Sequence, residues 1–216
     1  VSGLFIKTPA RFKHLKSTSY EFSVIADLMN KKAQELNLKH THFITPHGLD
    51  EEGHYTTGYE LALIADYALN IEKIAKVVST KVHNVNINGN IKTITNTNEL
   101  LGHLDGVNGI KTGFTNGAGK CLVTSVTRNG FNIITVVLGA DTKKTRTKDS
   151  INLIEYIYKN YEIVDLEELV NKEFEEWKKI NANRIVVNKG EKNNLKIGLD
   201  TFKYKLYPVK KEEIDN

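Results

Sequence analysis

Apolar positions in the first third of the chain recur at helical spacing. Four of them lie near one face of a helix predicted over residues 22–38: Phe22, Ile25, Met29 and Leu36. Residues 40–57 interrupt this pattern and predict a loop. Thr57-Gly58-Tyr59-Glu60 then has the Thr-x-x-Glu pattern of a capping box, which predicts a helix from Thr57 to about Leu69. A short third helix is predicted over residues 71–78.

The apolar spacing changes to alternation after this helical region. Residues 82–94 alternate around Asn88-Gly89, a strong signal for a two-residue hairpin turn. Two strongly apolar runs, residues 120–128 and 131–139, flank Asn129-Gly130 and predict a second hairpin in the middle of a sheet.

Two further elements complete this part of the prediction. Residues 107–112 are a short strand candidate just before the second hairpin. Residues 143–160 return to helical spacing, with Ile151, Ile154 and Tyr158 on one side. Helices that surround such a sheet predict an α/β (α+β) domain.

The pattern changes again from Glu162 onward, and we predict a domain boundary near Val164. Domain 1–164 would hold the sheet, while 165–216 would be a small, β-rich C-terminal domain. Residues 165–179 indicate an amphipathic linker or helix that includes Trp177. Three short strands are predicted after it, over residues 184–188, 195–199 and 202–207. Residues 1–20 have weak periodicity and indicate an irregular lead-in.

Composition is that of an ordinary globular protein with a mild basic excess. The 216 residues are 40% hydrophobic and 26% charged, with a net charge of +4. This excess is compatible with an anionic cell wall or membrane surface. No basic stripe with interleaved aromatic residues appears, which disfavours nucleic-acid binding.

Cysteine content and hydropathy exclude several other classes. Cys121 is the only cysteine, so an intrachain disulfide and a thiolate metal cluster are excluded, and its apolar neighbours predict a buried structural thiol. No run approaches the roughly 18 apolar residues of a membrane span. Val1 does not begin a signal peptide, so we expect the signal of an exported protein to lie outside this chain.

Candidate chemistry concentrates in residues 106–119, which contain Lys111-Thr112-Gly113 at the end of a predicted strand. A Gly-rich turn, the apolar hairpin and a helix with Arg146 follow the triplet. This context is much more specific than a lone Lys-Thr-Gly.

Several motifs in this order resemble the low-molecular-weight D-alanyl-D-alanine carboxypeptidases, a family of serine-type penicillin-binding proteins. They span roughly residues 22–161 and are Met29-Asn30-Lys31-Lys32-Ala33, Thr41-His42-Phe43, Pro46-His47-Gly48-Leu49-Asp50, Gly53-His54-Tyr55-Thr56-Thr57, Asn96-Thr97-Asn98-Glu99-Leu100-Leu101, Gly109-Ile110-Lys111-Thr112-Gly113-Phe114-Thr115 and Ala118-Gly119-x-Cys121-Leu122-Val123. The resemblance implies a β-lactamase/transpeptidase-like antiparallel sheet flanked by helices, N-terminally incomplete here, and a small all-β C-terminal domain.

The resemblance also implies a reaction and roles for individual residues. The family removes the terminal D-alanine of a peptidoglycan stem peptide through a serine acyl-enzyme. Lys111, Thr112 and Gly113 would be catalytic residues, with Lys111 supplying positive charge near the serine. Phe114, Thr115 and Arg146 would bind substrate. Thr112 and Arg146 suit the substrate carboxylate, and the Phe114 N–H would be one oxyanion-hole donor.

Implied partners follow from the same resemblance. They are the stem peptide and, for a complete enzyme, β-lactam antibiotics, with no cofactor and no metal. We expect a location at the outer face of the bacterial cytoplasmic membrane or in the cell wall. The family often adds a C-terminal membrane anchor, and this sequence stops at Asn216 without one.

The sequence departs from the family in the nucleophile. No Ser-x-x-Lys occurs, and the only Ser-x-Asn, Ser150-Ile151-Asn152, falls inside a predicted helix. Ser2-Gly3 resembles the start of the second motif, but Leu4 replaces its Asn. We therefore expect this polypeptide alone to be inactive and to form no penicilloyl adduct.

Two other function classes stay open. One is a non-catalytic peptidoglycan-peptide binding fragment that uses the same strand edge, and the other is an interaction module whose C-terminal tail docks onto a partner. A metal site is disfavoured because the sequence cluster of His40, His42, His47 and His54 lacks ligand spacing. In the resembled family, His47 and His54 are structural.

Overall fold

The computed structural model describes residues 18–181, 184, 186 and 206–214. The chain separates into two compact units, Val1–Tyr156 and Ile157–Asn216. This division falls several residues before the predicted boundary near Val164. The assignment of 1–164 and 165–216 as domains stays a prediction.

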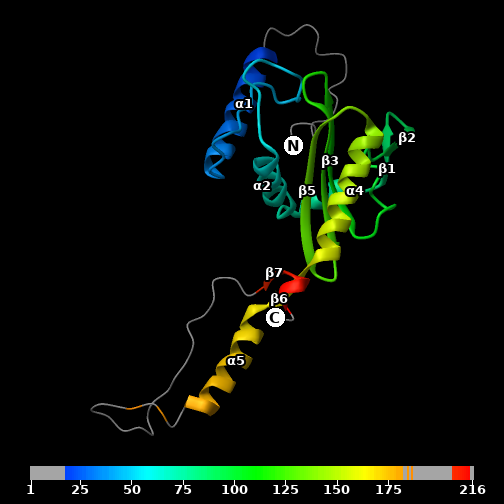
Figure 1. The fold of residues 1–216 in the computed structure, drawn as a ribbon. Helices are drawn as coiled ribbons and strands as arrows, with labels where there is room; N and C mark the ends of the chain where they lie inside the picture. The colour runs from blue at the N-terminus through cyan, green and yellow to red at the C-terminus, as the bar shows by residue number, and fades with distance from the viewer. Residues whose placement is uncertain (1–17, 182–183, 185, 187–205, 215–216) are drawn as a thin grey trace. The chain divides into compact units, whose positions relative to one another are not determined.

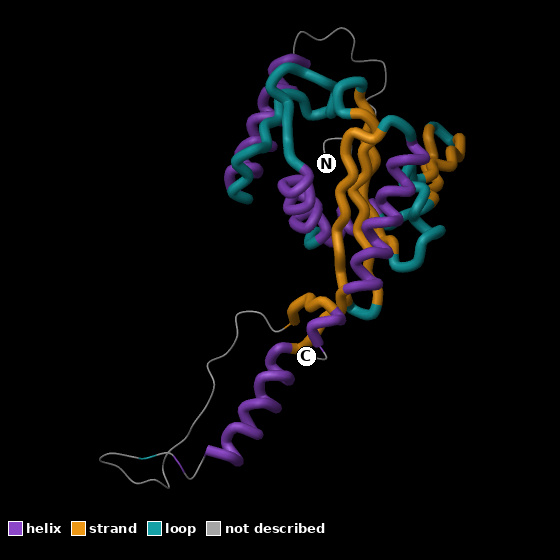
Figure 2. Tube along the Cα trace, in the orientation of Figure 1, coloured by secondary structure: helices purple, strands orange, loops and turns teal. Residues whose placement is uncertain are grey.

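The first unit is built on a three-stranded antiparallel sheet (Figure 2). Its strands are β3 (Val107–Thr115), β4 (Gly119–Arg128) and β5 (Phe131–Ala140), in the order β3-β4-β5. Asn129 and Gly130 have φ of 50° and 78°, as a two-residue hairpin turn requires, so the predicted hairpin is confirmed. Strand β3 runs to Thr115, three residues beyond its predicted end.

Helices α2 (Gly58–Leu69) and α4 (Lys143–Asn160) lie on opposite sides of this sheet (Figure 1). Leu122, Val126 and Ile154 are fully buried, and Ile154 belongs to the predicted apolar side of α4. A second apolar cluster joins the helices before the sheet to the strands: Ala65, Val78, Ile110 and Val123. Because helices cover both faces of the sheet, β4 and β5 each contain a run of consecutive apolar residues, Leu122-Val123 in β4 and Val136-Val137-Leu138 in β5.

Helix α1 (Thr18–Glu35) packs against the loop that follows it. Ala33, Leu38 and Phe43 form a buried cluster, and Asn30 bonds the backbone N–H and C=O of Phe43 at 2.8 Å each. These two bonds fix the start of the loop that reaches the candidate site.

The predicted capping box is only half formed. Thr57 Oγ1 accepts from the Glu60 N–H at 3.2 Å, as predicted. The Glu60 carboxylate does not close the box. It accepts from the backbone N–H groups of Lys39 at 2.8 Å and His40 at 2.9 Å, and from the Thr41 hydroxyl. A tertiary use of this buried carboxylate replaces the local one.

Two smaller elements lie between α2 and the sheet in sequence. Helix α3 (Glu72–Val78) follows α2, and the predicted hairpin is confirmed as β1 (Val82–Ile87) and β2 (Asn90–Thr95). Its turn residues have φ of 52° and 86°.

The second unit contains a strand pair and a long helix within its described residues. Strand β6 (Tyr161–Asp165) pairs with β7 (Leu206–Lys210), α5 (Leu166–Asn181) lies between them in sequence, and α6 (Lys211–Ile214) follows. The amphipathic stretch is thus a helix. The predicted strand 195–199 and most of 184–188 and 202–207 lie outside the described residues. No helix in the described part of the chain is long and apolar enough to cross a membrane.

Candidate active site

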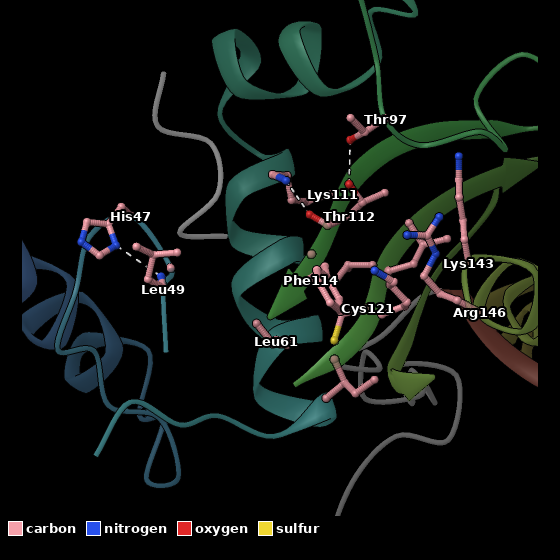
Figure 3. A pocket seen from close by; sticks show the side chains of 16 residues that line it. His47, Leu49, Leu61, Thr97, Lys111, Thr112, Phe114, Cys121, Lys143 and Arg146 are labelled. Carbon is pink, nitrogen blue, oxygen red and sulfur yellow. Dashed lines mark hydrogen bonds between the residues drawn. The ribbon is translucent and has the colours of Figure 1, made fainter. Parts of the chain in front are cut away.

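A cleft of about 530 Å³ runs along the Lys111-Thr112-Gly113 segment (Figure 3). Sixteen residues line it, and they are His47, Gly48, Leu49, Leu61, Thr97, Lys111, Thr112, Gly113, Phe114, Lys120, Cys121, Leu122, Val123, Leu138, Lys143 and Arg146. Five of the six predicted site residues are among them. Thr115 is the exception.

The Lys111-Thr112-Gly113 segment lies on β3, an edge strand of the sheet. Within the described residues β3 pairs only with β4. Its other edge therefore presents backbone donors and acceptors of the kind that an extended peptide can pair with.

Lys111 is half-buried, and its ammonium donates to the carbonyl oxygen of Thr112 (Figure 3). Burial lowers the pKa of Lys111 below its ordinary value. The desolvated charge would act on an anion in the cleft more strongly than a solvated one.

The hydroxyl of Thr112 lies 2.6 Å from that of Thr97. Thr97 is held in place by its neighbours. Asn98 donates to the Gly109 carbonyl at 2.9 Å, and Asn96 donates to the carbonyls of Val78 and Thr80. The loop before β3 is thus tied to the strand that it serves.

Phe114 and Cys121 lie between His47 and Arg146 in the cleft (Figure 3). Phe114 is 57% exposed, and Lys120 Nζ lies 3.0 Å from the centroid of its ring. Cys121 was predicted to be buried. It is instead only partly buried, because its register partner is Gly113, which has no side chain to cover it.

Thr115 holds the turn that follows β3. Its Oγ1 accepts from the Ala118 N–H at 3.0 Å, and Asp50 accepts from the Gly117 N–H at 3.1 Å. Hydrogen bonds from Thr115 and from this N–H lower the pKa of Asp50. The structure thus places Thr115 beside the cleft, where it supports the turn.

Arg146 lies on the first turns of α4 and is 4% exposed. Its Nη2 donates to both carboxylate oxygens of Glu99, at 2.9 and 2.8 Å. Glu99 also accepts from the Thr147 hydroxyl and lies 3.4 Å from Lys143 Nζ. Although partial burial raises the pKa of Glu99, these donors and charges outweigh it and lower the pKa.

The histidines before α2 have structural contacts. His54 accepts from the backbone N–H groups of Ile44 and Thr45, and the His47 ring packs edge-on against Phe22 at 5.5 Å. In the described residues, no three His, Cys, Asp or Glu side chains form a group that could hold a metal ion.

The fold is an antiparallel sheet flanked by helices, with a cleft along the Lys111-Thr112-Gly113 segment, and comparisons with known proteins identify the family. The family model described as D-alanyl-D-alanine carboxypeptidase matches residues 21–142, more than half of the chain. This chain therefore belongs to the D-alanyl-D-alanine carboxypeptidase family.

Individual relatives agree with this family. DacF, a D-alanyl-D-alanine carboxypeptidase of Bacillus subtilis, is 40% identical over 135 residues, which are 62% of this chain and 35% of DacF. DacA of Haemophilus influenzae, with the same description, is 32% identical over 193 residues, 88% of this chain and 45% of DacA. The chain spans less than half the length of either relative.

Solved structures agree on the fold. The DacD carboxypeptidase of Francisella tularensis superimposes with a TM-score of 0.64 at 28% identity, covering 67% of this chain and 47% of DacD. Penicillin binding protein 5 of Haemophilus influenzae gives 0.61 at 33% identity, covering 67% and 42%. The predicted transpeptidase-like fold is confirmed.

The sequence indicated no part in substrate binding or catalysis for four cleft residues: Thr97, Lys120, Cys121 and Lys143. Glu99 was also given none, although it contacts Arg146. Thr97 and Glu99 lie in the family-like motif of residues 96–101, so the sequence marked their position but did not predict their contacts. Lys143 carried no signal beyond its position at the start of a predicted helix.

Proposed function

We propose that this chain forms the substrate-binding wall of a serine-type D-Ala-D-Ala carboxypeptidase and binds the C-terminal end of a peptidoglycan stem peptide. One observation carries the proposal. The cleft has along it the edge of β3 that pairs with no other strand in the described part of the chain, and a buried arginine lines it. It therefore combines a peptide-pairing edge with a cation suited to a carboxylate.

The stem peptide would extend along β3 and pair with its backbone. A Cβ added to Gly113 would meet Cys121 Cβ at 3.7 Å, an ordinary contact, so packing within the sheet does not require glycine here. Close approach of a peptide backbone does give a reason for glycine. Thr112 and Arg146 would bind the terminal carboxylate.

The remaining predicted roles concern the reacting carbonyl. Lys111 would place its desolvated charge near the nucleophile and the developing oxyanion, and the Phe114 N–H would donate to that oxyanion. The nucleophile would be the serine of a Ser-x-x-Lys motif, which the 216 residues do not contain. Formation and hydrolysis of the acyl-enzyme would need a polypeptide that supplies it.

The family also indicates where such a protein works and what inhibits it. Peptidoglycan lies outside the cytoplasmic membrane, so the site would face the cell wall. A complete site would bind β-lactams. Peripheral attachment through a C-terminal anchor would belong to the same assignment.

A titration of the ¹⁵N-labelled chain with an acetylated peptide ending in D-Ala-D-Ala tests the binding role. We expect chemical-shift changes centred on residues 111–115. A Gly113→Val variant should keep the spectrum of the fold and bind the peptide about tenfold more weakly, a loss of about 1.4 kcal/mol. Shift changes elsewhere, with β3 unaffected, would contradict the proposal.

Incubation with a fluorescent penicillin, followed by intact mass, tests the missing nucleophile. We expect no adduct on the chain by itself. A stoichiometric adduct would mean that one of the serines present is activated.

The absence of Ser-x-x-Lys favours a second candidate, a non-catalytic binder of stem peptides. It predicts the same titration result. The two differ when a polypeptide carrying the Ser-x-x-Lys motif is added, because only the carboxypeptidase would then release D-alanine.

A further inference from the structure

Arg146 is buried although it lines the cleft. Its side chain is 5% exposed, so little water contacts the guanidinium. A buried arginine without a partner is strongly destabilising, and its position depends on what holds it. The groups that hold Arg146 therefore determine what it can offer to a ligand.

Glu99 holds Arg146 from outside the cleft. Glu99 does not line the cleft and instead borders a separate hollow with Lys144, Thr147 and Lys148. Both of its bonds to Arg146 go to Nη2, which leaves Nη1 and Nε outside the ion pair. Nε is buried with no partner among the described residues.

The Glu99 carboxylate is itself fixed in place. The Thr147 hydroxyl donates to Oε1, and Lys143 Nζ lies 3.4 Å from Oε2. Thr147 follows Arg146 on α4, so one carboxylate spans two neighbouring residues of the helix. The contact between Glu99 and Nη2 is therefore in place before a ligand binds, so ligand binding does not have to order it.

We propose that Glu99 is a positioning residue that holds Nη2 of Arg146 so that Nη1 serves a ligand carboxylate in the cleft. This inference rests on the proposed role of Arg146 in carboxylate binding. It makes Glu99 a determinant of specificity for peptides with a free C-terminus. Without Glu99, the guanidinium would leave its buried position for water or for another acceptor.

The test compares two ligands on each variant of the 216-residue chain. The ligands are the acetylated peptide ending in D-Ala-D-Ala and the same peptide with a C-terminal amide. The ratio of their dissociation constants, from ¹⁵N titrations, measures carboxylate preference. For the wild-type chain we expect a ratio of about tenfold, because the amide ligand lacks the charge-assisted hydrogen bond that the carboxylate makes.

Glu99→Ala should lower this ratio to about twofold, whereas Glu99→Gln should keep most of it because the amide oxygen still accepts from Nη2. The matched control is Glu155→Ala, which removes a 2.8 Å partner of Arg128 from the same helix. The control should keep the wild-type ratio. The Arg146 Nε–Hε signal should shift in the alanine variant and stay in place in the control.

The outcomes separate the role of Glu99 from the proposed role of Arg146. A wild-type ratio in Glu99→Ala would overturn the role of Glu99 and leave that of Arg146 intact. A wild-type chain without carboxylate preference would overturn the proposed role of Arg146 and the inference with it. If Glu99→Ala loses the spectrum of the fold, Glu99→Asp decides instead. It keeps the charge but withdraws it by one methylene, so the ratio should fall about threefold, and an unchanged ratio would overturn the role.

Discussion

Lys111 carries a positive charge that the fold half-buries beside the Thr112 carbonyl. Burial lowers its pKa, so the folded chain holds this proton less tightly than the unfolded chain does. Between the folded pKa and the ordinary value, the unfolded state binds more protons. Wild-type stability should therefore rise with pH in that window, and the charge costs stability at neutral pH.

We accordingly predict that Lys111→Met raises Tm at pH 7 by about 2–4 °C, which corresponds to about 1 kcal/mol for a domain of this size. Partial exposure of the ammonium keeps the gain small. The advantage over wild type should shrink as pH rises towards 10, as thermal unfolding monitored by circular dichroism would show. A lower Tm for the variant would mean that the bond to Thr112 outweighs the buried charge.

Thr112, Thr97 and Arg146 show what sequence reasoning misses at the residue scale. The chemistry of Lys111-Thr112-Gly113 and Arg146 was visible in the motif. The partners were not, because Glu99 is 47 residues from Arg146 and Thr97 is 15 residues from Thr112. Side-chain contacts at such separations depend on how loops return to the sheet, and spacing alone does not encode that path.

At the scale of elements, short sequence motifs predicted the features that depend only on neighbouring residues, namely turns and the helix N-cap. Both Asn-Gly hairpins formed because these residues tolerate positive φ at adjacent positions. The capping box formed only at Thr57, since Glu60 found three donors in another segment. A capping carboxylate is thus predictable by position, but its partner is not when a loop competes for it.

The loop around Asp50 and the β3–β4 turn form one linked structure through the bond to Gly117. We predict that Asp50→Ala speeds hydrogen exchange of the Gly117 amide several-fold, because that amide loses its acceptor. Glu51→Ala, a neighbouring exposed carboxylate, is the matched control and should leave the rate unchanged. Equal rates in the two variants would show that Asp50 does not hold the turn.

The same link should depend on pH. The pKa of Asp50 is lowered, so its contribution is present above the ordinary carboxyl range and is lost as pH falls through the lowered pKa. Protection of Gly117 in the wild-type chain should fall at acidic pH, whereas the Asp50→Ala variant should show no such step.

At the scale of the whole molecule, the two compact units predict separable behaviour. A chain without residues 165–216 should keep the ¹⁵N spectrum of residues 18–156 and bind the D-Ala-D-Ala peptide with the wild-type dissociation constant. Loss of the spectrum would show that the sheet depends on the second unit. Loss of binding to a protein partner, with peptide binding kept, would favour the interaction-module alternative.

The predicted domain boundary and the division into compact units lie at different positions. Composition changes near Glu162, while the compact units divide between Tyr156 and Ile157, inside α4. Composition reports what is exposed or buried on average. A division into compact units depends on which residues contact each other. A helix such as α4 can cross that division without any change in its amino-acid composition.

The free edge of strand β5 affects how the purified protein behaves in storage. Its ten residues contain no charge and no proline, and within the described residues only β4 pairs with it. Natural edge strands usually carry such residues as a defence against unwanted pairing. Samples of this chain are therefore expected to aggregate during storage, and to do so faster at higher protein concentration, unless another strand pairs with that edge.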